Sequence, residues 1–431
     1  MQTLAAMTID SNWIASLKGD CQQAFTSTAP FWPTAVFIDG QIKLNSASFE
    51  HTQTWDEYIK RQFLFRIQKY LNTAHVKAVI LAFDNYELVP RAKHMTQARR
   101  RQNIPLADFN SRDALPPTVP KGELWISHLC NRSFKSRLIE MVVYFLVQHL
   151  VIRPDQQFII DYTSHPVSYN HSKESSVLSD LQPLGEADVK FMRYVSMFNK
   201  LQVDSIDGDS VPIALLYMQK HYSGNPNIRL SILRMVCTVE STPKRKRSVR
   251  EYEYLDINLL YHFIVRDLIP QCVDRVVLPR VAGFEISMLV ILIALSGTDF
   301  SRKLAGITGK SLYEYMPLLW IHLAMAFDVH RKQVHAEAVL HKVLTVVYKH
   351  KFGRHVSDED CTSLNHLLHA LHNSKLSART KNQLQTIDVM RCTVRNANWI
   401  LQYWDQGTYP DPLSSDYGFT VDKGGAMAFQ A

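Results

Sequence analysis

Short apolar runs recur between residues 35 and 260, and several of them end in an acidic residue. Residues 35–39 (AVFID) and 76–84 (VKAVILAFD) are partly β-branched, and each closes on Asp. Between them, apolar residues recur at helical spacing from 55 to 72. This order of strand, helix and strand predicts a parallel pair whose carboxyl ends lie at one edge of a sheet.

Four further runs are predicted as strands: 158–161, 213–217, 228–239 and 252–257, the last two flanking a basic turn. From Phe284 to about Asp405 the pattern is almost wholly helical, and the tail from Gly407 is rich in Pro, Gly and Ser. The chain therefore predicts an α/β fold, with a mostly parallel sheet flanked by helices and a helical extension after it.

Acidic residues stand in five short segments, at the ends of apolar runs and at the starts of predicted helices. The seven residues are Asp39, Asp84, Glu186, Asp188, Asp207, Asp209 and Asp299. Two divalent ions about 4 Å apart stabilise the attacking and the leaving oxygen of a phosphodiester, and hard cations take several oxygen ligands. The set therefore predicts a site for two Mg²⁺ ions, which Mn²⁺ can replace.

Each acidic segment also has an ordinary structural interpretation. An Asp at the end of a strand often caps the next helix, acids are common in the first turn of a helix, and turns are rich in Asp and Gly. Asp161 also ends an apolar run, QFIID, which makes it an eighth candidate acid, but a weaker candidate for a metal ligand than the other seven.

Basic residues follow Asp84 in the stretch NYELVPRAKHMTQARRRQ. Arg91 is placed to stabilise the charge that develops on a phosphodiester as it breaks, and its neighbours are placed to bind nucleic acid: Lys93, Arg99, Arg100 and Arg101. Residues 95–150 could then form an arch over the site. The alternative is a solvated helix face.

Two other segments suit a phosphate backbone. In GITGK, Gly306, Gly309 and Lys310 lie between helical stretches, where a tight turn presents backbone amides to duplex without reading its sequence. Glycine also ends helices in general. The basic run 244–247 (KRKR) is either a nuclear import signal, a phosphate-binding patch or an exposed loop.

Composition narrows the class of protein. At 431 residues and 46% hydrophobic content the chain can bury a sizeable core. Its net charge of +8, despite seven acids assigned to one cluster, favours a polyanionic partner. Six cysteines without a CxxC pair indicate neither a zinc knuckle nor a disulfide framework and fit a reducing intracellular compartment. No leader or membrane-spanning run is predicted, so no membrane partner is expected.

Together these motifs resemble the flap endonuclease and XPG family of structure-specific nucleases over residues 33–320. VFIDG and LAFDN resemble the family's first two Asp segments, GEADVKF its Gly-Glu-Ala-Glu or Asp motif, and IDGDSV its paired Asp motif. ALSGTDF resembles its Gly-x-Asp-Tyr segment, with Phe300 in place of Tyr, and GITGK its helix-hairpin-helix.

The resemblance implies a PIN-like twisted sheet, a carboxyl-terminal helix-hairpin-helix and two Mg²⁺ ions. It implies three regions: 1–240 with the arch, 241–330 with the helix-hairpin-helix, and 331–431 as a helical extension and irregular tail. The implied activity is cleavage of DNA at flaps or single-strand/duplex junctions, as an endonuclease or 5′–3′ exonuclease in replication, repair or recombination, with proteins of those processes as candidate partners.

The ending NANWILQYWDQGTYPDP is similar to poxvirus flap-endonuclease-like proteins, which implies a viral member in the nucleus or a viral replication compartment. Two alternatives stay open. One is an RNA-directed endonuclease of the same fold, of the herpesvirus host-shutoff type, because phosphate contacts do not distinguish the sugars. The other is a catalytically silent nucleic-acid-binding scaffold, which would need none of the acids.

Overall fold

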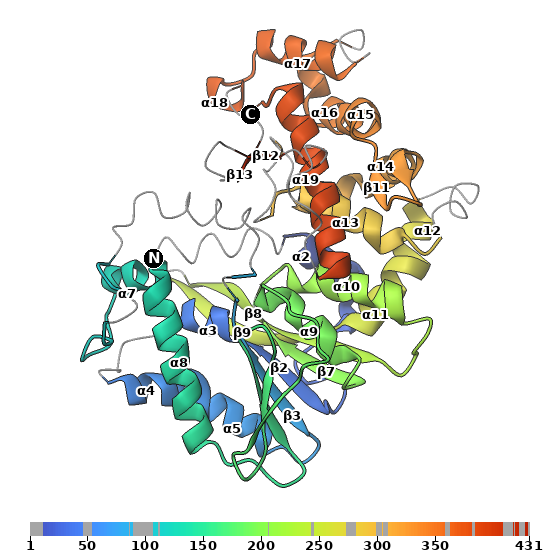
Figure 1. Ribbon diagram of the computed structural model, residues 1–431. Coiled ribbons are helices and arrows are strands. Elements are labelled where there is room, and N and C mark those ends of the chain that lie inside the picture. Colours follow the sequence, from blue (N-terminus) through green and yellow to red (C-terminus); the bar gives the residue numbers. More distant parts are fainter. Residues whose placement is uncertain are drawn as a thin grey trace.

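A mixed sheet and a mainly helical region make up the protein (Figure 1). The computed structural model describes residues 12–45, 54–85, 87–88, 107–110, 113–205, 207–242, 245–272, 282–298, 304, 309–357, 363–381, 384–407, 417, 419–421 and 427–429. None of the helices in these ranges combines the length and the hydrophobicity that a membrane span requires.

Nine strands among the described residues form the large sheet, and its five central strands run parallel. Antiparallel strands border this parallel part on both sides. In spatial order the strands are β1 (Phe25–Thr26), β9 (Arg245–Asp256), β8 (Arg229–Thr242), β7 (Lys200–Asp204), β2 (Ala35–Asp39), β3 (Ala78–Ala82), β4 (Gln157–Asp161), β5 (Val167–Tyr169) and β6 (Ser175–Val177).

The register aligns the carboxyl ends of the parallel strands. Asp39 of β2 lies opposite Ala82 of β3, which in turn lies opposite Asp161 of β4. On the other side of β2, Ile38 pairs with Asp204, the last residue of β7. Acidic residues therefore end three of the five parallel strands at the same sheet edge, which is where ligands bind in open α/β sheets.

Helices cover both faces of the sheet. Every residue of β2 and β3 is buried, and because alternate residues of a strand point to opposite faces, each of these strands packs against both helical layers. Phe37 packs into one apolar cluster and Ile38 into the other. The cluster around Ile38 includes residues of α4 (Trp55–Ile59), the π-helical segment η2 (Lys60–Leu64), α5 (Phe65–Leu71), α7 (Glu123–Cys130) and α8 (Arg132–His149).

The cluster around Phe37 is larger and includes both the opposite face of the sheet and the helical region. It contains residues of α2 (Asn12–Asp20), η1 (Gln22–Ala24), α9 (Ala187–Val195), α10 (Ser210–His221), α11 (Ile257–Phe263), η3 (Ile264–Leu268), α12 (Ile269–Cys272), α13 (Glu285–Leu295), α14 (Gly309–Ala326), η5 (Val339–Leu344), α16 (Thr345–Phe352), α17 (Leu364–Asn373) and α19 (Ile387–Gln406).

Short elements complete the described chain. They are α3 (Gly40–Asn45), β10 (Phe327–Asp328), β11 (Gln333–Val334), α15 (Ala336–Ala338), η6 (Gly353–His355), α18 (Ala378–Lys381), β12 (Phe419–Val421) and β13 (Met427–Phe429).

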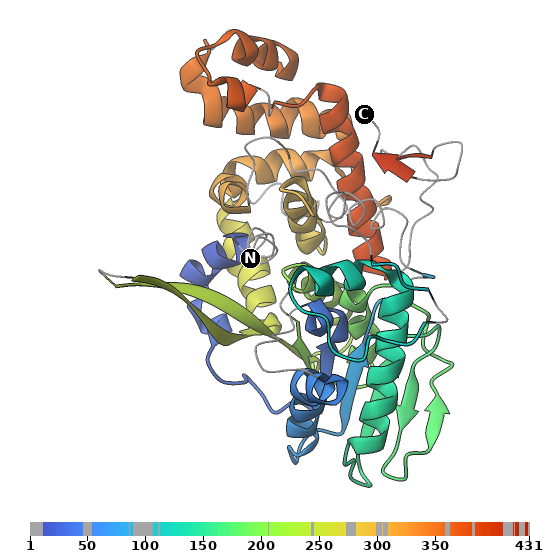
Figure 2. The same cartoon turned by 90° about the vertical axis from the view of Figure 1, so that its left-hand side faces the viewer.

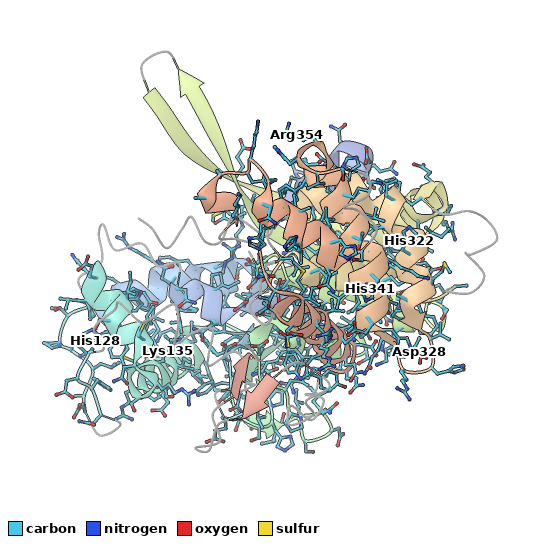
Figure 3. The ribbon with its side chains drawn as sticks, turned by 90° about the horizontal axis from the view of Figure 1, so that it is seen from above. His128, Lys135, His322, Asp328, His341 and Arg354 are labelled. Carbon is cyan, nitrogen blue, oxygen red and sulfur yellow. The ribbon has the colours of Figure 1, made fainter. Side chains whose placement is uncertain are left out.

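Strands β8 and β9 form a long hairpin that projects from the body of the molecule (Figures 2 and 3). Its ladder runs from the pair Ser231 and Asp256 to the pair Thr242 and Arg245. The basic run predicted in the turn therefore extends into β9, whose first residues are 245–247. Lys244 lies outside the described residues.

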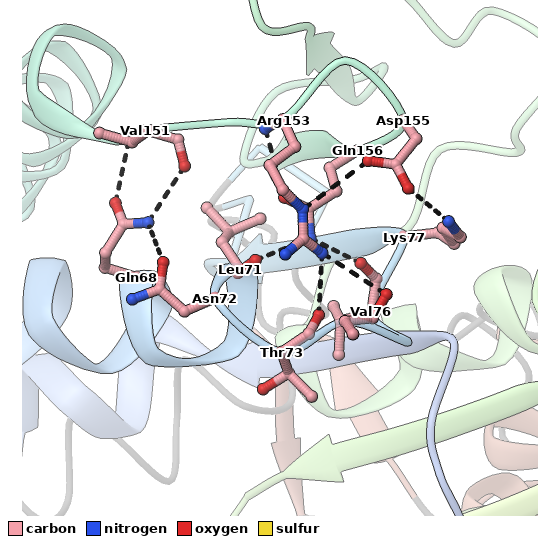
Figure 4. Close-up of polar contacts among 11 residues, drawn as sticks. Gln68, Leu71, Asn72, Thr73, Val76, Lys77, Val151, Arg153, Asp155 and Gln156 are labelled. Atoms are coloured by element: carbon pink, nitrogen blue, oxygen red, sulfur yellow. Dashed lines mark hydrogen bonds and ion pairs between the residues drawn. The ribbon is translucent and has the colours of Figure 1, made fainter.

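The amino-terminal edge of the sheet is closed by polar contacts (Figure 4). Gln156 donates to the carbonyl oxygens of Leu71 and Val76, at 2.8 and 2.7 Å, and Arg153 donates to that of Thr73 at 3.0 Å. Lys77 and Asp155 form an exposed ion pair there. These contacts join the turns before β3 and β4, so the edge opposite the candidate acids is structural.

Most of the predicted elements are confirmed, among them the helix over 55–72 and the parallel pairing of β2 with β3. The strand predicted at 213–217 is wrong, because these residues lie in α10. Every residue of α10 from Ser210 to Met218 is buried, so no polar face reveals the helical period. Strand β7 was not predicted, since KLQVD carries polar residues at two of its first three positions.

Candidate active site

Asp39 lies at the junction between β2 and α3. Its side chain is buried, and its Oδ1 atom accepts a hydrogen bond of 3.0 Å from the backbone amide of Ile42. Gly40 follows, and a Cβ atom there would lie 2.5 Å from the ring of Phe83 and 2.8 Å from the carbonyl oxygen of Ala82. The missing side chain lets the end of β2 press against the end of β3, which brings Asp39 toward the segment that carries Asp84.

Asp84 lies two residues beyond β3 and is buried. Its Oδ1 atom accepts a hydrogen bond of 3.0 Å from the backbone amide of Ala187, the first residue of α9. The next residue, Asn85, donates its backbone amide to the carbonyl oxygen of Gly185 at 2.6 Å. Two hydrogen bonds therefore join the LAFDN and GEAD segments, which the sequence separates by about a hundred residues.

Glu186 and Asp188 flank the first residue of α9, as the sequence predicted. Glu186 takes the N-cap position and is buried, and Asp188 lies in the first turn and is half-buried. The positive end of the helix dipole therefore faces Asp84 and Glu186, which suits an anionic cluster. Glu186 also accepts a hydrogen bond of 3.0 Å on its Oε2 atom from the hydroxyl of Tyr403, in α19.

Asp161 is held by basic side chains of α9. Lys190 of α9 forms an ion pair of 3.1 Å with Asp161 and donates to the carbonyl oxygen of Phe83 at 2.7 Å. Arg193 binds the same carboxylate, and the hydroxyl of Tyr194 donates to it at 2.7 Å. Burial lowers the pKa of Lys190, and Asp161 opposes that shift. These contacts fasten α9 onto the ends of β3 and β4.

Asp207 and Asp209 lie in the turn between β7 and α10, and both are half-buried. The backbone amide of Asp209 donates to Oδ1 of Asp207 at 3.1 Å, and the amide of Asp207 donates to the hydroxyl of Ser205 at 3.2 Å. Because β7 lies next to β2, this turn follows the same sheet edge as Asp39.

Asp204 is a buried acid of this edge that sequence reasoning missed. It forms an ion pair of 3.2 Å with Lys43 of α3, another with Arg66 of α5, and accepts a hydrogen bond of 3.3 Å from Tyr70. Burial acts against the charge of Arg66, but Asp204, Tyr70 and Tyr252 together outweigh it and raise the pKa of Arg66. Like Asp39, Asp204 is an acid that ends a strand. The sequence did not reveal it as a candidate, because strand β7 itself was not predicted.

Other predicted site residues fall outside the description. The residues outside the described ranges are Asp299, Arg91, Lys93, Gly306 and the run 99–101. Only the backbone is described for Gly309 and Lys310, which begin α14. Their roles stay predictions, as does the arch. In the described part of the arch, Trp125 and Phe134 are buried in the core.

Among the described residues, no group of three or more His, Cys, Asp or Glu side chains is arranged to hold a metal ion. The donor types nevertheless suit a hard divalent cation, because Asp39, Asp84 and Glu186 supply carboxylate oxygens from neighbouring segments of one sheet edge. The chemistry of the donors fits Mg²⁺ or Mn²⁺, and the ligand set stays a prediction.

No protein-family model and no curated protein matches this sequence. Among solved structures, the catalytic core of Rad2 in complex with a DNA substrate aligns with 91% of this chain and 97% of its own, at 12% identity and a TM-score of 0.36. Similarity at this level assigns neither a family nor an activity.

Proposed function

We propose that this protein is a divalent-metal-dependent nuclease that cleaves DNA at flaps or single-strand/duplex junctions. The observation that carries the proposal is the contact between Asp84 and the backbone amide of Ala187, next to Glu186. It makes neighbours of two acidic segments far apart in the chain, at the sheet edge where Asp39 also ends its strand. Acidic motifs in the order typical of flap endonucleases support the same assignment.

A divalent ion at this edge would polarise the phosphodiester and lower the pKa of a bound water molecule. The proposed ligands are Asp39, Asp84, Glu186, Asp188, Asp207, Asp209 and Asp299. The chain's own contribution is to hold these carboxylates in place: the Ile42 and Ala187 amides fix Asp39 and Asp84, and the turn hydrogen bonds fix Asp207. Arg91 is proposed to stabilise the developing charge on the phosphate.

The remaining proposed contacts bind the nucleic-acid backbone. Basic residues near Asp84 would draw in the strand to be cut, and the segment that leads into α14 would hold duplex, in keeping with the net charge of +8. These residues are Lys93, Arg99, Arg100, Arg101, Gly306, Gly309 and Lys310.

The decisive experiment incubates the purified chain with Mg²⁺, Mn²⁺ or EDTA and labelled 5′ flap, nicked duplex, single-stranded DNA and RNA. We expect cleavage at the junction of the flap substrate that depends on the metal. Cleavage confined to RNA would replace the DNA assignment with the RNA-directed nuclease. Tight binding with no cleavage under any condition would indicate a scaffold, and neither binding nor cleavage would overturn the proposal.

Single substitutions in the acidic set test whether the carboxylates act together. Asp84→Ala and Asp209→Ala should each lower the rate of cleavage by about a hundredfold or more, because removal of one electrostatic group in an active site costs about 10²–10³ in rate. Binding of the flap should be retained. Asp155→Ala is the control, since Asp155 is exposed at the opposite sheet edge. Near-normal turnover by both site variants would contradict the shared metal site.

A further inference from the structure

The last long helix of the chain reaches the candidate site. Figure 1 shows α19 running from the far end of the helical region down to α9 and α10. Near its end, the hydroxyl of Tyr403 donates a hydrogen bond of 3.0 Å to Oε2 of Glu186, across 217 positions of sequence. Both side chains are buried, with 0% and 1% of their surface exposed, so water does not compete for this bond.

Neighbouring contacts fix the ring of Tyr403. The ring of Trp399, one turn earlier, stacks on it with the ring centres 5.3 Å apart. Gly407 ends the helix in the left-handed conformation, with φ of 68°, and donates its amide to the carbonyl oxygen of Tyr403 at 2.8 Å. A glycine suits this position, because positive φ disfavours a side chain.

The end of α19 also packs against residues that precede and follow Glu186 in the sequence. A Cβ atom at Gly407 would lie 3.2 Å from Leu184, just before the GEAD segment, and 3.3 Å from Met192 in α9. Asp405 accepts a hydrogen bond of 3.3 Å from Lys332, and its carbonyl oxygen accepts one of 3.1 Å from Lys220 of α10. The helix end therefore cannot shift without disturbing the segment that presents Glu186.

We infer that Tyr403 is a positioning residue for Glu186, so that the carboxyl-terminal helix is a component of the candidate site. A phenylalanine would fill the same space, and the hydroxyl adds one function: by donating to Oε2, it favours one orientation of the carboxylate about its last bond. Hydrogen-bond partners of this kind orient metal ligands and tune their affinity. The inference rests on the proposed role of Glu186 as a metal ligand.

The test compares Tyr403→Phe with Tyr348→Phe. Tyr348 is a fully buried tyrosine of α16 whose hydroxyl has no hydrogen-bond partner among the described residues, so its loss is a matched chemical change away from the site. Mn²⁺ binding is measured by calorimetry without nucleic acid, and the single-turnover rate is measured across Mg²⁺ concentrations. Tyr403→Phe should raise the metal concentration needed by about ten- to a hundredfold. Tyr348→Phe should match the wild type.

A double-mutant cycle separates positioning from general support of the fold. If Tyr403 acts through Glu186, adding Tyr403→Phe to Glu186→Gln should cause no further loss of Mn²⁺ affinity. An equal loss in both backgrounds overturns the inference. Should Tyr403→Phe not fold, 3-fluorotyrosine at position 403 keeps the ring and changes the donor strength; it should shift Mn²⁺ affinity, and an unchanged affinity overturns the inference.

The outcomes also separate this inference from the proposed function. If the wild type binds Mn²⁺ and cleaves DNA, but Tyr403→Phe binds and cleaves like the wild type, the nuclease stands and the role of Tyr403 is overturned. If the wild type neither binds a divalent ion nor cleaves any substrate, both fall together.

Discussion

Four buried acids at one sheet edge differ in the groups that hold them. Asp161 and Asp204 form ion pairs with lysine and arginine side chains of the flanking helices. The hydrogen bonds described above for Asp39 and Asp84 come instead from backbone amides. A cation that already neutralises a carboxylate competes with a metal ion for it. Asp161 and Asp204 are therefore poor ligand candidates, although each ends a strand at this edge.

Residue patterns alone distinguish a candidate metal ligand from a structural acid only in part. An apolar run that ends in Asp predicted the positions of Asp39, Asp84 and Asp161 equally well. It could not tell which carboxylate meets a buried cation, because Lys190 lies 29 residues from Asp161 on another element. The contact between Glu186 and Tyr403 could not be predicted from the sequence, because no local pattern indicates a hydrogen bond across 217 positions.

The buried pair predicts a large loss of stability in Asp161→Asn. The substitution leaves the charges of Lys190 and Arg193 without their shared carboxylate inside the protein, and breaking a buried pair in this way costs about 3–5 kcal/mol. Chemical denaturation monitored by circular dichroism measures the loss.

Asp155→Asn is the matched control, since it breaks the exposed pair with Lys77. It should leave the unfolding midpoint nearly unchanged, because solvent already screens that pair. Equal midpoints for the two variants would mean that backbone carbonyls, such as that of Phe83, suffice to hold Lys190.

At the scale of elements, the pattern of apolar residues predicted the secondary structure correctly where a helix has one solvent-exposed face or a strand is short and apolar. It identified β2, β3 and β4 and the helix over 55–72. It failed for α10, which is buried on all sides over its first nine residues, and for β7, in which the polar Gln202 is buried next to Tyr70. Tertiary contacts decided both elements.

The junction of β2 and α3 gives a prediction at this scale. In Gly40→Ala, the added methyl group would overlap the ring of Phe83 and the carbonyl oxygen of Ala82, so β2 and β3 must separate at the edge that carries Asp39 and Asp84. We expect a loss of stability of about 1–3 kcal/mol, the usual cost of overpacking, and a fall in cleavage rate beyond it. Thermal melting and the single-turnover rate measure the two effects.

Gly19→Ala serves as the control for this substitution. Gly19 lies in α2, and a Cβ atom there would have no atom within 4 Å, so this variant should be as stable as the wild type or slightly more stable. A Gly40→Ala protein with normal stability and normal cleavage would show that the strand ends tolerate separation, and that the close approach does not position Asp39.

At the scale of the whole molecule, the three regions predicted from the sequence share one core. A single apolar cluster contains Trp13 of α2, Phe37 of β2, Ile291 of α13, Trp320 of α14 and Trp404 of α19. The division at 240 and 330 stays a prediction about sequence regions. The packing argues that these regions depend on each other for folding, because removing one exposes apolar surface of the others.

Truncation tests this dependence. A chain that ends at residue 386 loses α19, and with it the buried side chains of Trp399, Ile400, Tyr403 and Trp404, which pack on the same cluster as the all-buried helix α13. We expect this chain to lack a cooperative thermal transition and to be digested rapidly in limited proteolysis.

A chain that ends at residue 418 is the control. It keeps α19 and Tyr417, whose carbonyl oxygen accepts a hydrogen bond of 2.6 Å from Asn396, and it should melt like the full chain. The strands it loses, β12 and β13, pair only with each other among the described residues, and an isolated hairpin contributes little stability. Cooperative unfolding of the chain that ends at 386, with flap cleavage retained, would establish the carboxyl-terminal region as a separable domain. It would also remove α19 from the site, because the acids would then hold their places without it.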